Sequence, residues 1–145
     1  MTIPKITLKV SVSGQATEKI ESAKDVQKFI KKIFDADTFN WQEEFILLCI
    51  NQPGKIIGYY KISKGGLAAT VADPRMIFTV ALNTPGTTKI ILSHNHPSGE
   101  LKPSPEDIKL THKIIAGGQI LEIKVLDHII VGQSGYYSFA EHDLI

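Results

Sequence analysis

Residues 44–50 constrain the fold more than any other stretch, because they read Glu-Phe-Ile-Leu-Leu-Cys-Ile with a charge only at the start. A half-exposed strand alternates apolar and polar residues, whereas a nearly continuous apolar run predicts a strand that is covered on both faces. The turn-forming residues 51–54, Asn-Gln-Pro-Gly, follow directly, and the alternating stretch 56–62 comes next. We therefore predict a buried strand that forms a hairpin with a second strand.

The rest of the chain mixes strand patterns with helix patterns. Capping residues and apolar periodicity predict helices over residues 22–34 and 73–82, and a third helix that starts at Ser104 and stops at Gly117-Gly118. Further strands are predicted over residues 5–12, 89–93, 121–126, 127–131 and 136–139. Strands interleaved with helices predict an α/β fold, in which a mixed β-sheet is flanked by helices.

The length of the chain suits one ordinary domain. With 145 residues, of which 43% are hydrophobic, the chain can fill one core but not two. Residues 1–40 carry one predicted strand and one predicted helix. We interpret them as a strand-helix extension packed on a domain formed by residues 41–145.

Charge and cysteine content limit the function classes. Lys+Arg 16 against Asp+Glu 15 gives a formal net charge of +1, so we expect DNA binding to be weak at most. The one cysteine, Cys49, excludes internal disulfides and cysteine-rich zinc sites, and its apolar strand makes it a core residue. No stretch approaches the roughly 18 apolar residues that cross a bilayer, and the N-terminus resembles no signal peptide. We therefore expect a soluble, cytoplasmic protein.

Two histidines and one aspartate predict a metal site. His94 and His96 stand two residues apart at the end of a predicted strand, so both imidazoles project to the same side and can reach one cation. Asp107 lies in the first turn of the following helix, where the positive helix end favours an ionised carboxylate. Two histidines and a carboxylate leave a fourth position open for water, which is the arrangement of a catalytic zinc rather than a structural one.

Each of these signals has a plain alternative when taken alone. A His-x-His pair often arises by chance, and Ser104 with Asp107 also forms an ordinary capping box that needs no metal. His112 falls five residues after Asp107 on the helix, which turns it away from the metal side. His128 lies among apolar residues, and we interpret it as a hydrogen-bonded structural histidine rather than a fourth ligand.

The spacing of these residues resembles the JAB/MPN (JAMM) metalloprotease family. Its signature is His-x-His, seven residues, Ser, two residues and Asp, which His94, His96, Ser104 and Asp107 match without a gap. The stretches 94–99 (His-Asn-His-Pro-Ser-Gly), 126–128 (Leu-Asp-His) and 137–140 (Tyr-Ser-Phe-Ala) resemble more narrowly the bacterial RadC-like branch. The resemblance runs from about Trp41 to the C-terminus. It implies a JAB/MPN-type, cytidine-deaminase-like sandwich with one Zn²⁺ per chain.

The resemblance also implies a reaction. The family uses a glutamate on an early strand as general acid and base, and the family pattern selects Glu43, two residues before Phe45, with Glu44 as the alternative. Side chains alternate along a strand, so only one of the two glutamates can face the metal. A metal-activated water would attack a peptide or isopeptide bond, and Glu43 would move its proton to the leaving amine. The Ser104 hydroxyl would help to hold the oxyanion.

Two other function classes compete with this hydrolase. A zinc deaminase needs His-x-Glu and Pro-Cys-x-x-Cys, which a chain with one cysteine cannot supply. A non-catalytic or accessory RadC-like module in DNA repair is the remaining alternative. Longer RadC-like proteins place a helical region of DNA-binding type before this domain, whereas about forty residues precede the resemblance here. The partner that we expect is an unidentified protein or peptide substrate and not a membrane, and the residues indicate no oligomeric state.

Overall fold

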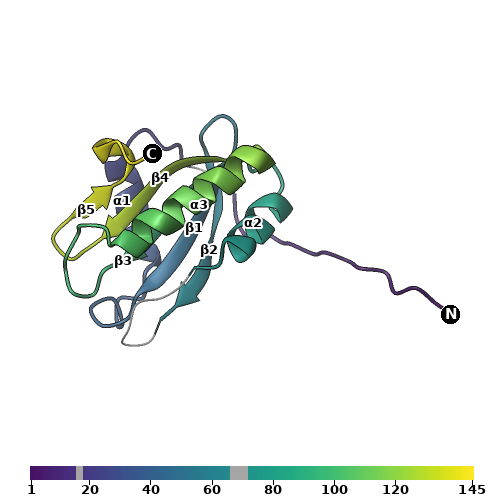
Figure 1. Cartoon of the computed structure of the whole chain (residues 1–145), viewed down its shortest axis with the longest axis horizontal. Helices are drawn as coiled ribbons and strands as arrows, with labels where there is room; N and C mark the ends of the chain where they lie inside the picture. Colours follow the sequence, from purple (N-terminus) through teal and green to yellow (C-terminus); the bar gives the residue numbers. More distant parts are fainter. Residues whose placement is uncertain (16–17, 66–71) are drawn as a thin grey trace.

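The computed structural model describes residues 1–15, 18–65 and 72–145 of the chain. Within them, one mixed sheet has the strand order β2-β1-β3-β4-β5, and helices cover both of its faces (Figure 1). The strands are β1 (Glu44–Ile50), β2 (Ile56–Lys64), β3 (Lys89–Asn95), β4 (Lys124–Val131) and β5 (Tyr136–Ser138). The helices are α1 (Ala23–Ile33), α2 (Pro74–Asn83), α3 (Pro105–Leu121) and the short 3₁₀ helix η1 (Ala140–His142). The predicted α/β fold is confirmed.

β1 lies inside the sheet, antiparallel to both β2 and β3, and all of its residues are buried. This confirms the predicted internal strand and the hairpin that follows it. β3 and β4 are parallel and are joined through α3, since parallel neighbours need a crossover connection. No helix of the described residues has the length and apolar character needed to span a membrane.

The side chains of β1 divide between two cores, because successive residues of a strand point to opposite faces. The odd-numbered residues from 45 to 49 join the core under α2 and α3, and the even-numbered residues from 46 to 50 join the core under α1. Figure 1 shows α2 and α3 in front of the sheet and α1 behind it. Cys49 is buried in the first of these cores, as its apolar surroundings predicted.

α3 continues through its glycine pair to Leu121, so the prediction that Gly117-Gly118 ends the helix is wrong. A Cβ on Gly117 would lie 2.8 Å from the Phe78 ring of α2, and a Cβ on Gly118 would collide with the carbonyl oxygen of Ile123. The glycines therefore permit close packing rather than a stop. The helix ends instead at Glu122, whose φ of 58° is left-handed.

The strands predicted over residues 121–126 and 127–131 are one strand, β4, so the predicted division before Asp127 is wrong. The pairing of β4 with β3 has an irregularity at this point, between Ile90 and Ile91, and the strand runs on past it. Asp127 tolerates burial because its carboxylate accepts hydrogen bonds from the backbone N–H groups of His128 and Ala140 at 2.7 and 3.0 Å. The Ser138 hydroxyl donates a third, at 2.6 Å.

Residues 5–12 form no strand and are exposed, so the strand predicted there is also wrong. In Figure 1 the start of the chain extends away from the sheet, whereas Val12 lies beside β2, where a Cβ on Gly58 would be 3.6 Å from it. An alternating pattern creates an apolar face, but a strand needs a neighbour that takes up its backbone hydrogen bonds. The pairing that the N-terminal region does make is an isolated bridge between Lys19 and Lys55, the residue just before β2. The predicted helix of the N-terminal extension does form, and α1 buries Val26 and Ile30 against the sheet.

Candidate metal centre

The C-terminal end of β3 brings two histidines together. His94 is the second-last residue of the strand and His96 follows it, so both rings lie on the same side of the chain. Their Nε2 atoms are 2.8 Å apart. Because β1 and β4 flank β3 on both sides, the side chain of His94 is only 1% exposed.

The first turn of α3 places the Asp107 carboxylate against both rings. Its Oδ1 atom lies 3.3 Å from His94 Nε2, and its Oδ2 atom lies 3.3 Å from His96 Nε2. Ser104 is the N-cap of the helix: its hydroxyl oxygen accepts from the Asp107 N–H at 3.1 Å, and its own N–H donates to Asp107 Oδ2 at 2.8 Å. The capping box and the histidine contacts therefore coexist, and the cap holds the carboxylate in place.

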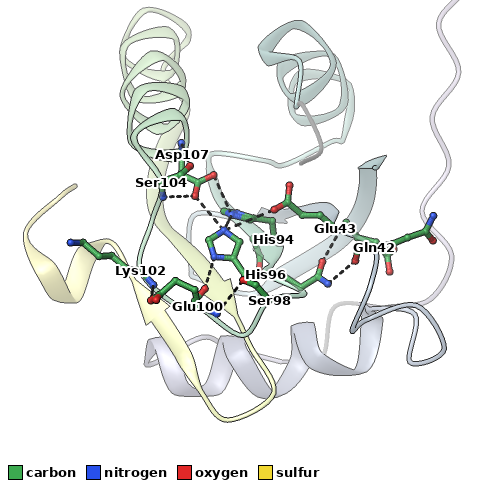
Figure 2. A network of polar contacts seen from close by, with 12 residues as sticks. Gln42, Glu43, His94, His96, Ser98, Glu100, Lys102, Ser104 and Asp107 are labelled. Carbon is green, nitrogen blue, oxygen red and sulfur yellow. Dashed lines mark hydrogen bonds and ion pairs between the residues drawn. The ribbon is translucent and has the colours of Figure 1, made fainter. Parts of the chain in front are cut away.

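Glu43 reaches the same cluster from the residue before β1. Its Oε1 atom lies 3.9 Å from His96 Nε2, and Figure 2 shows the two imidazoles between the carboxylates of Asp107 and Glu43. The ligand atoms of Glu43, His94 and His96 all lie within 4.8 Å of one another, so these three residues could hold a metal ion. Four of the five residues singled out from the sequence thus meet through charged or imidazole groups, and the fifth, Ser104, caps the helix beside them.

Glu44 lies elsewhere. Its carboxylate is 1% exposed, forms an ion pair with Lys61 at 2.9 Å and accepts a hydrogen bond from the Asp35 N–H at 2.8 Å. These contacts join the loop after α1 to β2. The environment of Glu44 is therefore structural, whereas that of Glu43 includes the histidines.

Asn95, the residue between the two histidines, was not singled out from the sequence. Its side chain is fully buried, accepts from the Glu44 N–H at 2.7 Å and donates to the carbonyl oxygens of Phe39 and Gln42, both at 2.8 Å. These bonds fix the chain that carries Glu43 toward the site. The available signal was the alternation of the strand, which turns residue 95 away from its histidine neighbours, together with the need of any buried amide for partners.

Behind His94 lies a second buried histidine. The Nδ1 atom of His94 is 2.8 Å from Nε2 of His128, whose Nδ1 is 2.6 Å from the Thr111 hydroxyl oxygen. Burial lowers the pKa of His128 well below its usual value, and the neighbouring His94 lowers it further, so the ring is neutral. His112, which the helix geometry turned away, is exposed.

The charges and protons of the cluster leave lone pairs facing inward. His96 Nδ1 lies 2.6 Å from the Glu100 carbonyl oxygen, which can only accept, so Nδ1 carries the proton and the neutral ring presents a lone pair at Nε2. Burial alone would raise the pKa of Asp107, but its close contacts with the His94 and His96 rings outweigh burial and hold that pKa well below the usual range. The carboxylate is therefore ionised at neutral pH.

The donor set fits a metal ion. Ligands at about 2.0 to 2.1 Å from a tetrahedral ion are about 3.3 Å apart, and each imidazole Nε2 lies 3.3 Å from an oxygen of Asp107. Without a cation, two imidazole lone pairs and a carboxylate would repel one another at these separations. Either a proton or a metal ion relieves that repulsion.

A mixed α/β sheet with a histidine and carboxylate cluster at the end of an inner strand is the arrangement of a JAB/MPN-type domain. The chain belongs to the RadC-like JAB domain family, whose family model matches residues 20–144. That match includes α1 as well as the sheet.

Three relatives illustrate the similarity. A UPF0758 protein of Flavobacterium johnsoniae is 42% identical over 127 residues, which cover 88% of this chain and 54% of the relative. A UPF0758 protein of Porphyromonas gingivalis is 38% identical over 135 residues, covering 92% of this chain and 59% of the relative. One of Trichodesmium erythraeum is 43% identical over 100 residues, covering 69% and 41%. The chain thus spans about half the length of the curated relatives it matches.

Proposed function

We propose that this chain is a zinc-dependent metallopeptidase that hydrolyses a peptide or isopeptide bond, with zinc held by His94, His96 and Asp107. The observation that carries the proposal is the convergence of two imidazole Nε2 atoms and an ionised carboxylate within 3.3 Å, beside the second carboxylate of Glu43. Imidazole nitrogen and carboxylate oxygen are common zinc ligands.

The position of Glu43 supports an open, catalytic site. Its oxygen lies 3.9 Å from His96, further than the 3.3 Å that separates Asp107 from each ring. A closed structural site would use a fourth protein ligand, whereas a catalytic one keeps that position for water. Bound zinc would polarise the scissile carbonyl and lower the pKa of its water toward about 7.

The chain's own residues would carry the proton transfers. Glu43 takes a proton from the attacking water and gives it to the leaving amine, so that the products are a carboxylate and an amine. The Ser104 oxygen accepts from the backbone of Asp107, and its hydroxyl proton is not used in that bond. The Ser104 hydroxyl would use that proton to donate a hydrogen bond to the oxyanion that develops on the substrate. Asp107 supplies the negative charge that balances the metal.

The test is peptide hydrolysis by the zinc-loaded chain, with Glu43→Gln as the matched control. New peptide termini, detected by mass spectrometry in a mixed peptide pool, should depend on zinc and on Glu43 and should vanish with a chelator. The Glu43→Gln protein should also retain substrate in a pull-down without cutting it. Zinc binding without turnover or capture would overturn the peptidase proposal.

The alternative function, an accessory module in DNA repair, makes a different prediction, which the same purified protein can test. A net charge of +1 gives little excess to neutralise phosphates. We therefore expect dissociation constants on the order of 10⁻⁶ to 10⁻⁴ M for duplex, single-stranded and branched oligonucleotides at physiological salt. Tight, salt-resistant binding by fluorescence anisotropy would favour the repair module over the peptidase.

A further inference from the structure

We infer that Thr111 and His128 form a hydrogen-bonded relay that fixes the proton of His94 on Nδ1, so that its Nε2 lone pair is held ready for the metal. The inference rests on the proposed use of His94 as a zinc ligand, but it concerns residues outside the ligand set. It assigns Thr111 and His128 as positioning residues, which act on the metal through His94.

The relay starts at the backbone of Asp107. The Thr111 hydroxyl oxygen lies 2.7 Å from the Asp107 carbonyl oxygen, one helical turn earlier, and two oxygens this close need a proton between them. A carbonyl carries no proton, and a threonine hydroxyl has one. Thr111 therefore donates to Asp107, and toward any other neighbour it can only accept.

The next neighbour is His128, whose Nδ1 atom lies 2.6 Å from the Thr111 oxygen. Since Thr111 accepts there, Nδ1 of His128 carries the hydrogen. Both Thr111 and His128 are fully buried, and a cationic imidazole without an anion beside it would be strongly disfavoured at such a place. The neutral ring thus has its lone pair at Nε2.

That lone pair faces His94 Nδ1 at 2.8 Å, so His94 donates from Nδ1. The remaining lone pair of His94 is then at Nε2, which is the atom that meets His96 and Asp107. The direction of every hydrogen bond follows from the first, and the reverse order would put the proton of His94 where the metal should bind. The relay therefore selects the ligand-competent form of the ring.

Packing restrains the rings as well as their protons. Phe139 stacks on His128 with centroids 4.6 Å apart, and Phe45 stacks on His94 with centroids 5.7 Å apart and planes within 6°. The relay connects β3, β4 and α3, and it ends on the carbonyl of Asp107. The two ligands that come from different elements, His94 and Asp107, are thereby held in one frame. Outer partners of this kind typically change metal affinity by about 10- to 100-fold when removed.

The first experiment needs no variant and no metal. Long-range ¹H–¹⁵N spectra of the metal-free chain, labelled at histidine nitrogens and recorded at mildly alkaline pH, report which nitrogen of each neutral ring is protonated. The His94 signals are identified by their loss in His94→Gln. We expect protonation at Nδ1 for both His94 and His128. Protonation of His94 at Nε2 would overturn the relay, whatever the chain does to peptides.

The second experiment compares Thr111→Val with Thr111→Ser by zinc competition against a chelator. Valine keeps the shape and loses the hydroxyl, so zinc binding should weaken by about 10- to 100-fold, whereas serine keeps the hydroxyl and should keep the affinity. Circular dichroism of each metal-free variant reports folding separately. Unchanged zinc affinity in folded Thr111→Val would contradict the inference. Failure to find a peptide substrate would count against the proposed function alone, because neither readout involves hydrolysis.

Discussion

The carboxylates of Glu43 and Glu44, neighbours in the chain, serve different environments. Glu43 lies 3.9 Å from His96, whereas Glu44 is paired with Lys61 at 2.9 Å. The alternation of side chains at the start of β1 thus separates a group placed for proton transfer from a group that ties the sheet to the loop after α1.

Exchanging each glutamate for glutamine should separate chemistry from stability. Glu43→Gln keeps the shape and removes the basic oxygen, so hydrolysis should fall by at least about 100-fold while zinc content stays the same. Glu44→Gln should leave hydrolysis in place and lower the free energy of unfolding by about 1 to 3 kcal/mol, because Lys61 loses its buried anion. Turnover, metal analysis and chemical denaturation measure the three quantities. The reverse pattern would contradict the role given to Glu43.

One zinc per chain is expected, and the fold should not depend on it, since both cores are built from apolar side chains of the sheet and helices and include none of the proposed ligands. His96→Ala should empty the site and leave the circular dichroism spectrum unchanged. Asp107→Ala should empty it too and cost about 1 kcal/mol more, because it also breaks the cap of α3. Elemental analysis decides the first point, and a zinc content near zero that reconstitution cannot raise would refute it.

Zinc should reverse the response of the protein to pH. Burial lowers the pKa of His96, but hydrogen bonds to Asp107 and to the Glu100 carbonyl outweigh it, and the net pKa is raised. A raised folded-state pKa gives stability that is fully present below the unfolded value of about 6.5 and is lost as pH rises through the folded value. Zinc competes with that proton, so the zinc-loaded protein gains stability over the same interval.

Denaturation of both forms across this pH interval measures whether the metal-free protein loses stability, and the zinc-loaded protein gains it, as the pH rises. His96→Gln is the control, because it should remove the contribution of His96 to the pH dependence of stability in the metal-free protein. Parallel curves for the two forms would rule out competition between zinc and the His96 proton.

Asn95 should matter for hydrolysis more than for zinc binding. Asn95→Asp keeps the oxygen that accepts from Glu44 but sets a carboxylate against the carbonyls of Phe39 and Gln42. We expect a loss of about 2 to 3 kcal/mol in unfolding free energy, from two lost donors in a buried place. Turnover should drop because the chain carrying Glu43 loosens. Zinc affinity equal to that of the wild type, together with reduced turnover, is the expected signature, and unchanged turnover would contradict it.

Gly118→Ala should destabilise the protein although alanine is the better helix former. The usual gain of about 1 kcal/mol over glycine is outweighed, since the new Cβ meets the carbonyl oxygen of Ile123, which is backbone and cannot move aside. Gly117→Ala is the comparison, because its Cβ meets the ring of Phe78, which can shift. Thermal melts should rank Gly118→Ala as the less stable variant.

Local signals predicted much of this fold from the sequence. The apolar run of β1 and the caps Asp73 and Ser104 act within a few residues of themselves, and the elements they predicted are present. The wrong predictions concern segments whose conformation depends on residues outside the segment itself. Gly118 continues a helix because of its packing against Ile123, and residues 5–12 form no strand although Val12 lies beside Gly58 of β2.

The same division applies to the candidate site. His94, His96 and Asp107 stand within fourteen residues of sequence, so spacing could suggest that they meet. Asn95 binds partners 51 to 56 positions away, and His128 reaches His94 across 34 positions. Those contacts depend on which strands are adjacent, and the order β1-β3-β4 cannot be derived from the periodicity of any single strand.

The enclosure of β1 should make its backbone amides exchange with solvent slowly. Its backbone is paired on both edges and covered on both faces, so its amides reach water only when the whole sheet opens. β1 should therefore be among the last segments to take up deuterium, while residues 1–15 should exchange at once. The amide of Glu44 begins this slow zone, bonded to Asn95, and Glu43 stands one residue outside it. The boundary between slowly and rapidly exchanging backbone amides thus falls beside Glu43, the carboxylate that is proposed to move the proton.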